Sequence, residues 1–399
     1  MVPNPKPYSI ASESRTPTPR ILPMPLFLRL LPFLCLSAAA APEFSETPLF
    51  TAGEGGYHTY RIPTLLRSSK GTLLAFCEGR KTSGSDHGDI DIVLRRSTDG
   101  GKTWEDLSVV QEEGNDAKIT IGNPVPVLDE STGHIHLIFT RDNDRVFHSA
   151  STDDGKTWSE RKEITPAVKR EEWGWYAPGP VHGIQLKRGA QAGRLVIPCD
   201  HRLGEDAKDK GPMGAQVVYS DDHGATWKLG ATAQTTATTA PNENSCVELV
   251  SPSTSGSSRL YFNARDHVAP HARASAISED GGITYATGEF TDAPHFNCPT
   301  VQGCLLRLRA TDQGDPGNRI LFSCADGPTR ARISIWSSTD EAATWSAPKL
   351  VHEGPGAYSD MALLAPGRVA MIYEKGSSKP YETITLALFN EEWLDAKPQ

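Results

Sequence analysis

Three arginines stand out in this sequence because each lies in or beside a short apolar stretch. Arg61 stands in Tyr-Arg-Ile-Pro, Arg265 in Phe-Asn-Ala-Arg and Arg330 in Pro-Thr-Arg-Ala-Arg. One arginine in a strand most often forms a structural ion pair. Three guanidinium groups meeting in one hollow would repel each other unless an anion or acidic neighbours lay among them. Their planar sets of donors suit a carboxylate, so a site for a carboxylate ligand is one function to consider.

A second arginine follows the third candidate closely. Arg332 comes two residues after Arg330, so both side chains would point to the same face of a strand. Arg330 is preferred because it stands eight residues before Ser338, where a repeated motif begins.

Several acidic residues could act beside these arginines. Glu243 and Glu248 lie in one short stretch, and the apolar neighbours of Glu248 favour a structural role for it. Asp86 and the lesser candidate Asp89 lie in a loop rich in Gly and Ser that begins at Lys81. A general acid needs such an exposed position, although an aspartate in a loop of this kind is more often a turn residue.

A repeated motif, S-x-D-x-G-x-T-W, indicates how these distant residues could be brought together. Its five copies, of which the last two are weaker, are Ser97–Trp104, Ser151–Trp158, Ser220–Trp227, Ser278–Tyr285 and Ser338–Trp345. They start 54, 69, 58 and 60 residues apart. Ser and Asp can bond their own backbone and Gly supplies a positive φ, so each copy predicts a hairpin turn. The motif lacks the ligand pattern of an EF-hand.

The chain reads as all-β, because short apolar runs alternate with turns and no long stretch has the helical period. A turn about every 60 residues predicts stacked four-stranded units. We therefore expect a six-bladed β-propeller with four-stranded antiparallel blades, formed by residues 42–399 as one domain. Both ends of this domain would share the closing sheet, which removes exposed sheet edges.

The repeated motif resembles the Asp-box of sialidases, which are six-bladed propellers. Asp-boxes also occur in propellers that are not sialidases, so the motif supports the fold and not the chemistry. The match becomes specific at Arg61, Arg265 and Arg330, which are similar to the arginine triad that holds the carboxylate of sialic acid in that family. The resemblance runs in order from Arg61 to Glu374. It implies an exo-α-sialidase that retains configuration and acts on sialylated glycoproteins, glycolipids or oligosaccharides.

The resemblance also implies the catalytic roles. Tyr358, in Gly-Ala-Tyr-Ser-Asp, matches the nucleophile. A neutral phenol suits a reacting carbon that bears a carboxylate, because an anionic nucleophile would be repelled. Glu243 matches the base that activates Tyr358, although Asn244 and Ser245 stand where the family usually has Cys and Gln. Asp86 matches the residue that first acts as acid and then as base.

Further residues complete the site that the resemblance implies. Glu374 matches the acid that holds the first arginine in place, and Arg80 a further arginine that contacts substrate. Weaker candidates are Glu78, as another support of an arginine, and Asn123 and Tyr176, which could shape the pocket for the N-acetyl and glycerol groups. Packing explains Tyr176 about as well. Neither a metal nor an organic cofactor is implied.

Two other functions would use many of the same residues. A non-catalytic sialic-acid-binding propeller would keep the arginines and lack a working set of tyrosine, glutamate and aspartate, all of which are present here. A trans-sialidase would use the same catalytic residues together with a site for a sugar acceptor, and the sequence leaves this function open.

The chain has a net charge of −9 and a sequence pI of about 5.8, which argues against a nucleic-acid partner. Arg29, the apolar run 30–36 and the small residues 37–41 predict a signal peptide over residues 1–41. Met24 is a candidate for the true start, and a short membrane anchor is the alternative. The apolar run is shorter than the ~18 residues of a transmembrane span. We expect a secreted or periplasmic protein, with a monomer favoured.

The cysteines after residue 41 show no metal-binding spacing: Cys77, Cys199, Cys246, Cys298, Cys304 and Cys324. Most are expected to be buried thiols. The pair Cys298–Cys304 is the first candidate for a disulfide, since export would permit one.

Overall fold

The structure is a computed structural model that describes residues 1, 13, 14, 16, 40–115, 117–204, 210–251, 253–268 and 273–397. The chain divides into two compact units, Met1–Ala40 and Ala41–Gln399. The signal peptide expected over residues 1–41 falls almost wholly outside the described residues and stays a prediction. Within the described ranges, no helix combines the length and the apolar character that crossing a membrane requires.

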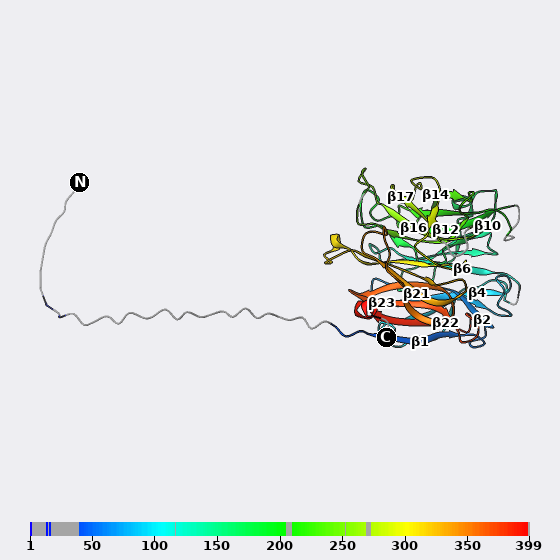
Figure 1. Cartoon of the computed structure of the whole chain (residues 1–399), viewed down its shortest axis with the longest axis horizontal. Helices are drawn as coiled ribbons and strands as arrows, with labels where there is room; N and C mark the ends of the chain where they lie inside the picture. The colour runs from blue at the N-terminus through cyan, green and yellow to red at the C-terminus, as the bar shows by residue number, and fades with distance from the viewer. Residues whose placement is uncertain are drawn as a thin grey trace. The chain divides into compact units, whose positions relative to one another are not determined.

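The unit Ala41–Gln399 is built almost entirely of antiparallel strands (Figure 1), which confirms the all-β class. Four of its sheets are separate from one another. Their strands are β2 (Thr59–Arg67), β3 (Leu73–Arg80), β4 (Ile90–Ser97) and β5 (Ser108–Gln111); β6 (Ile121–Leu128), β7 (Ile135–Arg141), β8 (Arg145–Ser151) and β9 (Lys162–Glu163); β10 (Trp173–Pro178), β11 (Ile184–Gln185), β12 (Leu195–Leu203), β13 (Met213–Ser220) and β14 (Lys228–Gln234); and β15 (Pro241–Glu248), β16 (Leu260–Asp266), β17 (Arg273–Ser278) and β18 (Thr291–Ala293).

The fifth sheet has seven strands in the order β1-β24-β23-β22-β21-β20-β19. These are β19 (Cys304–Arg309), β20 (Arg319–Ala325), β21 (Ala331–Ser338), β22 (Lys349–Ala365), β23 (Arg368–Lys375), β24 (Thr383–Asn390) and β1 (Phe44–Thr51). Short helices α1 (Thr165–Val168), η1 (Thr311–Gln313) and α2 (Glu391–Asp395) complete the unit. Pairing of β1 with β24 joins the two ends of the unit in one sheet, as expected.

The structure has five hydrogen-bonded sheets where the sequence predicts six separate blades. The cause is β22, an extended strand of 17 residues that does not break between its two halves. Its first half pairs with β21 up to Pro355, and its second half pairs with β23 from Gly356 onward. One strand therefore belongs to two of the four-stranded units that the repeat predicts.

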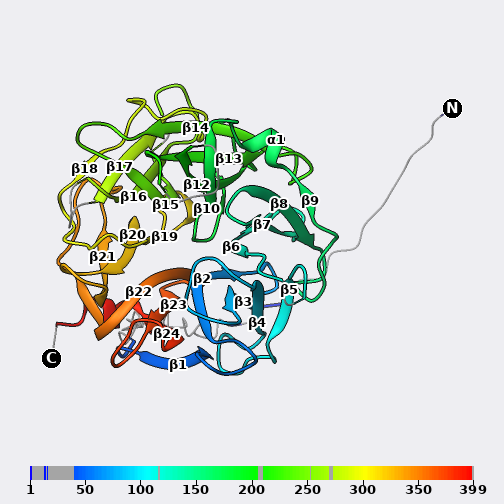
Figure 2. The ribbon, with the colours of Figure 1, turned by 90° about the vertical axis from the view of Figure 1, so that its right-hand side faces the viewer.

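The sheets follow one another around a ring and form a propeller-like fold (Figure 2). The hydrophobic core lies between neighbouring sheets. For example, Phe76 and Ile92 of one sheet pack with Leu137 and Phe139 of the next in a single buried cluster. Burying both faces of each sheet in this way removes apolar area from water and fixes the inner strands relative to each other.

The repeated motif forms the same turn in all five places, which lie between β4 and β5, β8 and β9, β13 and β14, β17 and β18, and β21 and β22. In the first copy, Ser97 Oγ accepts a hydrogen bond from Gly101 N at 2.9 Å, and Asp99 Oδ1 accepts one from Thr103 N at 2.9 Å. Gly101 has a φ of +91°, where glycine is favoured. The fifth copy has Ala342 at this position with a φ of +68°, which is strained for a residue with a Cβ.

The cysteines among the described residues are buried free thiols. Cys304 Sγ lies 3.0 Å from Asp360 Oδ1, so the candidate disulfide between Cys298 and Cys304 is not formed in the structure.

Candidate active site

Side chains from distant strands meet around the hydroxyl of Tyr358, which lies on β22. Glu243 of β15 accepts the hydrogen bond that Tyr358 Oη donates to its Oε1. Arg265 of β16 donates from Nη1 to Glu243 Oε2 at 2.8 Å and to Tyr358 Oη at 3.2 Å. All three are largely buried, so one phenol, one carboxylate and one guanidinium share a proton-exchanging contact shielded from water.

The environment keeps Tyr358 neutral and Glu243 ionised. Burial and the charge of Glu243 raise the pKa of Tyr358 well above that of a free phenol, although Arg265, Arg330 and Arg61 oppose this. Burial alone would raise the pKa of Glu243. The charge of Arg265 and the Tyr358 hydroxyl outweigh burial, so the pKa of Glu243 lies below its usual value. An un-ionised phenol therefore lies beside an ionised carboxylate that can accept its proton.

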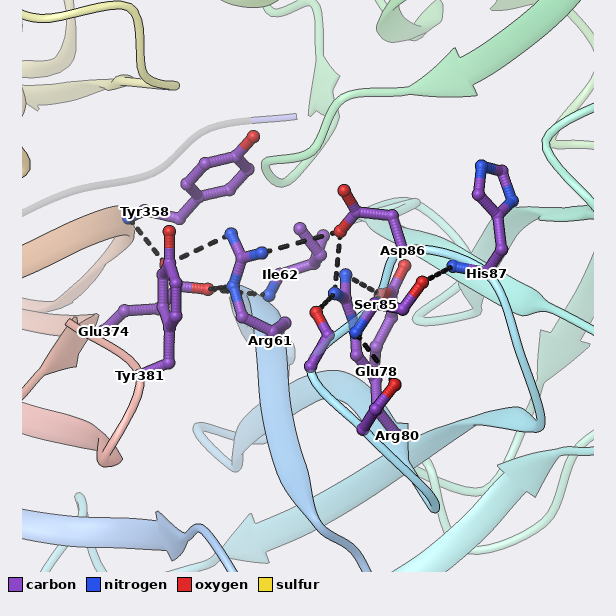
Figure 3. A network of polar contacts seen from close by, with 12 residues as sticks. Arg61, Ile62, Glu78, Arg80, Ser85, Asp86, His87, Tyr358, Glu374 and Tyr381 are labelled. Atoms are coloured by element: carbon purple, nitrogen blue, oxygen red, sulfur yellow. Dashed lines mark hydrogen bonds and ion pairs between the residues drawn. The ribbon is translucent and has the colours of Figure 1, made fainter. Parts of the chain in front are cut away.

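Arg61, on β2, is held by Glu374 of β23 (Figure 3). Arg61 Nε donates to Glu374 Oε1 at 2.7 Å, and Nη2 approaches Oε2 at 3.4 Å. The same carboxylate accepts from the backbone N–H groups of Ile62 at 3.1 Å and Tyr358 at 3.2 Å. Ile62 has a φ of +60°, which a β-branched residue rarely adopts. Fully buried Glu374 thus fixes Arg61 and the backbone of Tyr358 together.

Arg330, directly before β21, completes the group of arginines. Its guanidinium carbon lies 5.6 Å from the centre of the Tyr358 ring, and that of Arg61 lies 5.0 Å from the same ring. Arg332 turns away with a φ of +57° and pairs with Glu353 at 2.6 Å. The structure therefore places Arg330, and not Arg332, beside the phenol.

Asp86 lies on the side of Arg61 that faces away from Glu374, on the exposed loop between β3 and β4 (Figure 3). Its Oδ1 is 2.7 Å from Arg80 Nη1 and 3.6 Å from Arg61 Nη1. Burial would raise the pKa of Asp86, but the charges of Arg80 and Arg61 outweigh it and lower this pKa. Arg80 is in turn held by Glu78 Oε2 at 2.7 Å from its Nη2.

A family model described as a BNR repeat-like domain matches residues 71–371 of the chain. The chain belongs to the BNR repeat-like domain family. The curated relatives that it resembles carry the name sialidase. The curated sialidase of Micromonospora viridifaciens is 32% identical over 377 residues, which cover 88% of this chain and 55% of that protein. Sialidase-2 of Mus musculus is 29% identical over 394 residues, covering 88% of this chain and 96% of that protein.

Solved structures resemble this BNR repeat-like chain over most of its length. A Hadza microbial sialidase matches with a TM-score of 0.71 at 26% identity, over 86% of this chain and 68% of that chain. The present chain therefore spans about half of the Micromonospora protein and nearly all of the mouse protein.

Three other residues of this BNR repeat-like protein were expected at the site from the sequence: Asn123, Tyr176 and Asp89. Asn123 donates its backbone N–H to Glu78 Oε1 at 2.9 Å, so it lies behind Arg80. Tyr176 is fully buried and packs against Trp173, which agrees with a packing role. Asp89, the lesser candidate for the acid, forms an ion pair with Lys81 at 2.9 Å.

Two residues near the arginines were missed by the sequence analysis. Tyr381, in the loop between β23 and β24, accepts a hydrogen bond from Arg330 Nη1 at 2.7 Å. His267 Nε2 accepts one from Arg265 Nε at 2.9 Å, and burial and the charge of Arg265 lower the pKa of His267 to about 4. Neither lies in a motif, so only their positions in space identify them.

One cluster in the described part of the chain combines possible metal ligands: His182, Cys304 and Asp360, whose ligand atoms lie within 4.8 Å of one another. Asp360 already accepts hydrogen bonds from His182 Nδ1 at 2.7 Å and from the backbone N–H of Leu65 at 2.8 Å. These contacts tie the inner strands together and account for the cluster as a structural one.

A cavity of about 570 Å³ lies at the opposite, C-terminal ends of the inner strands. It is lined by residues such as Arg67 of β2, Glu248 of β15 and Leu363 of β22, and by none of the residues grouped around Tyr358. The residues grouped around Tyr358 and this cavity therefore lie at opposite ends of the same strands.

Proposed function

We propose that this chain hydrolyses the bond between a terminal α-linked sialic acid and the rest of a glycan, with retention of configuration. It is a glycosidase of the exo-sialidase type, as its sialidase relatives indicate. The observation that carries the proposal is the hydrogen bond from a neutral, buried Tyr358 to the ionised Glu243, formed among three guanidinium groups.

The three arginines select the substrate. A carboxylate on the anomeric carbon would lie among Arg61, Arg265 and Arg330, and would relieve the repulsion between their charges. Two of these arginines already have carboxylate partners, Glu374 and Glu243, which orient them before the substrate arrives. A carboxylate held in this way would bring the anomeric carbon beside the Tyr358 hydroxyl.

The first step forms a covalent intermediate. As Tyr358 Oη attacks the anomeric carbon, Glu243 accepts its proton, and the bond to the leaving oxygen breaks while Asp86 donates a proton to that oxygen. In the second step Asp86 takes a proton from water, and the resulting hydroxide replaces Tyr358 on the carbon. Tyr358 then regains its proton from Glu243, which restores the free enzyme.

Substrate binding itself prepares Asp86 to donate a proton. In the free protein Arg80 and Arg61 hold the pKa of Asp86 below its usual value. A bound substrate carboxylate would draw the charge of Arg61 to itself and add a negative charge nearby. Both effects raise the pKa of Asp86 and favour its protonated form.

We also propose that the unit is a six-bladed propeller: counting β22 in two sheets divides its strands into six blades, the last of which is closed by β1. A signal peptide over residues 1–41 would direct the protein to the periplasm or the exterior, where sialylated glycans are met.

Proton NMR of the purified protein with a sialyllactose tests the proposal. We expect the α-anomer of free sialic acid as the first product, followed by slow conversion to the β-anomer. Appearance of the β-anomer first would contradict retention, and absence of turnover with tight binding would favour a sialic-acid-binding protein. Labelled lactose in the same reaction would reveal transfer if the protein is a trans-sialidase.

A further inference from the structure

Arg330 differs from the other two arginines in the groups that hold it. Arg265 and Arg61 each pair with a buried carboxylate. Among the described residues no carboxylate forms an ion pair with Arg330. Its hydrogen bonds go to Tyr381 Oη at 2.7 Å and to the backbone oxygen of Thr300 at 3.3 Å. The direction of this guanidinium therefore depends on neutral partners.

Tyr381 contacts two of the three arginines at once. Its hydroxyl accepts the hydrogen bond from Arg330, and its ring lies under Arg61, whose guanidinium carbon is 4.1 Å from the ring centre. Figure 3 shows the Tyr381 side chain close to Arg61 and Glu374. The face of the Tyr381 ring attracts the charge of Arg61, and the Tyr381 hydroxyl accepts a hydrogen bond from Arg330. This one side chain therefore offsets part of the repulsion between the two guanidinium groups.

The loop that carries Tyr381 is fixed on both sides. Glu382 accepts backbone hydrogen bonds from Ser377, Ser378 and Lys379, each at 2.9 Å, which closes the loop into a compact turn. The backbone oxygen of Glu382 also accepts a hydrogen bond, at 3.0 Å, from the N–H group of Ala52, which directly follows β1. A side chain on such a loop has a defined position, as a positioning residue requires.

From this geometry we propose that Tyr381 is a positioning residue of the substrate site, which sets the direction of Arg330 relative to Arg61. The inference rests on the proposed function, because the arginines are taken to bind the carboxylate of a sialic acid. Tyr381 acts through the two guanidinium groups and is not assigned a part in bond breaking. Its loss should therefore weaken carboxylate binding more than it slows the chemical step.

The test measures the affinity of a 2,3-unsaturated sialic acid analogue and of its methyl ester by calorimetry, together with sialoside kinetics. Tyr381→Phe keeps the ring on Arg61 and removes the acceptor of Arg330. We expect about tenfold weaker binding of the acid, equivalent to about 1.4 kcal/mol, because a hydrogen bond to a charged group is lost. Tyr381→Ala removes both contacts, and about a hundredfold loss is expected.

The kinetics and the ester separate positioning from a general structural role. In Tyr381→Phe, KM should rise about tenfold while kcat stays within about threefold, because the carboxylate is held in both the ground state and the transition state. The uncharged ester should bind wild type and variant equally. Tyr219→Ala is the matched control, since Tyr219 lies on β13, away from this site, and its ring centre is 4.4 Å from the guanidinium carbon of Arg194. It should leave affinity unchanged.

A double-mutant cycle tests the route through Arg330. In an Arg330→Ala background, Tyr381→Phe should weaken binding of the acid less than twofold further. A full tenfold loss there would overturn the proposal, as would unchanged affinity in Tyr381→Phe and Tyr381→Ala while the wild type binds and turns over. If the wild type neither binds the acid nor turns over a sialoside, the proposed function itself fails.

Discussion

Strand β15 carries a buried glutamate near each end, and the two differ in whether their hydrogen-bond partners can release a proton. Glu243 accepts a hydrogen bond from the phenol of Tyr358, whose proton can transfer. Glu248 accepts from the backbone N–H groups of Lys187 and Arg188, each at 2.9 Å, and from Arg188 Nη1 at 2.8 Å. Those N–H groups do not release protons at ordinary pH. In the proposed mechanism, the same residue type on one strand is thus a base at one end and a structural anchor at the other.

The two ends of the inner strands repeat this difference on a larger scale. Around the cavity of about 570 Å³, Arg188, Arg307 and Arg309 each form an ion pair, for example Arg307 with Glu341 at 2.6 Å. At the Tyr358 end, Arg330 is held by neutral groups, and no carboxylate among the described residues forms an ion pair with it. A group of charges that remains partly unpaired can bind a ligand, whereas fully paired charges hold the fold.

Removing the phenol should have the largest effect of any change at either end. Tyr358→Phe deletes the nucleophilic oxygen and keeps the ring beside Arg61 and Arg330. We expect kcat to fall on the order of 10⁴-fold, a loss comparable to that caused by removing one catalytic residue from other enzymes that form covalent intermediates. Binding of the unsaturated analogue should change less than about fivefold. Turnover of an activated aryl sialoside measures the first effect, and activity near the wild-type level would exclude Tyr358 as nucleophile.

The base comes next. Glu243→Gln cannot take the proton of Tyr358, so kcat should fall on the order of 10³-fold. The identical substitution at the other end of β15, Glu248→Gln, is the control and should leave kcat within about twofold. Steady-state kinetics of both variants measure the comparison directly. Equal losses in the two variants would mean that the contrast between the ends has no chemical meaning.

The pH dependence should sharpen the comparison further. Glu243 must be ionised, and its pKa is lowered, so activity should persist as pH falls through the usual glutamate range. Asp86 must be protonated, and its pKa is lowered in the free protein, so kcat/KM should be highest at acidic pH and decline as pH rises. Bound substrate raises this pKa, so the decline of kcat should begin at higher pH. Coinciding declines of kcat and kcat/KM would contradict the role of Arg61.

The turns of the fold could be predicted from the sequence because the hydrogen bonds that form each turn join residues close together in the chain. The motif at Ser97 predicts a turn whose hydrogen bonds all lie within a few residues, and the structure contains that turn. The joining of two predicted units through β22 depends on whether an extended chain continues through Pro355 and Gly356. No local pattern at those residues distinguishes a continued strand from a new one.

The residues around Tyr358 could be named only through the family resemblance. Arg330 and Arg332 have the same local pattern, and a positive φ at Arg332 separates their directions in space. Tyr381 lies in a loop without periodicity, and its importance comes from two arginines more than 50 residues away in the sequence. Such contacts are set by the packing of distant sheets, which a single sequence does not display.

The smallest expected effect lies at the structural end of β15. Glu248→Gln replaces a carboxylate that accepts three hydrogen bonds with an amide whose NH₂ group would face donors. Because the site is buried, we expect the free energy of unfolding to fall by about 2 kcal/mol. The urea midpoint measures this loss, with Glu279→Gln on the more exposed pair with Arg259 as the control that should change little. A stable Glu248→Gln variant with reduced turnover would show that this end takes part in catalysis, and the distinction between the two glutamates would then be lost.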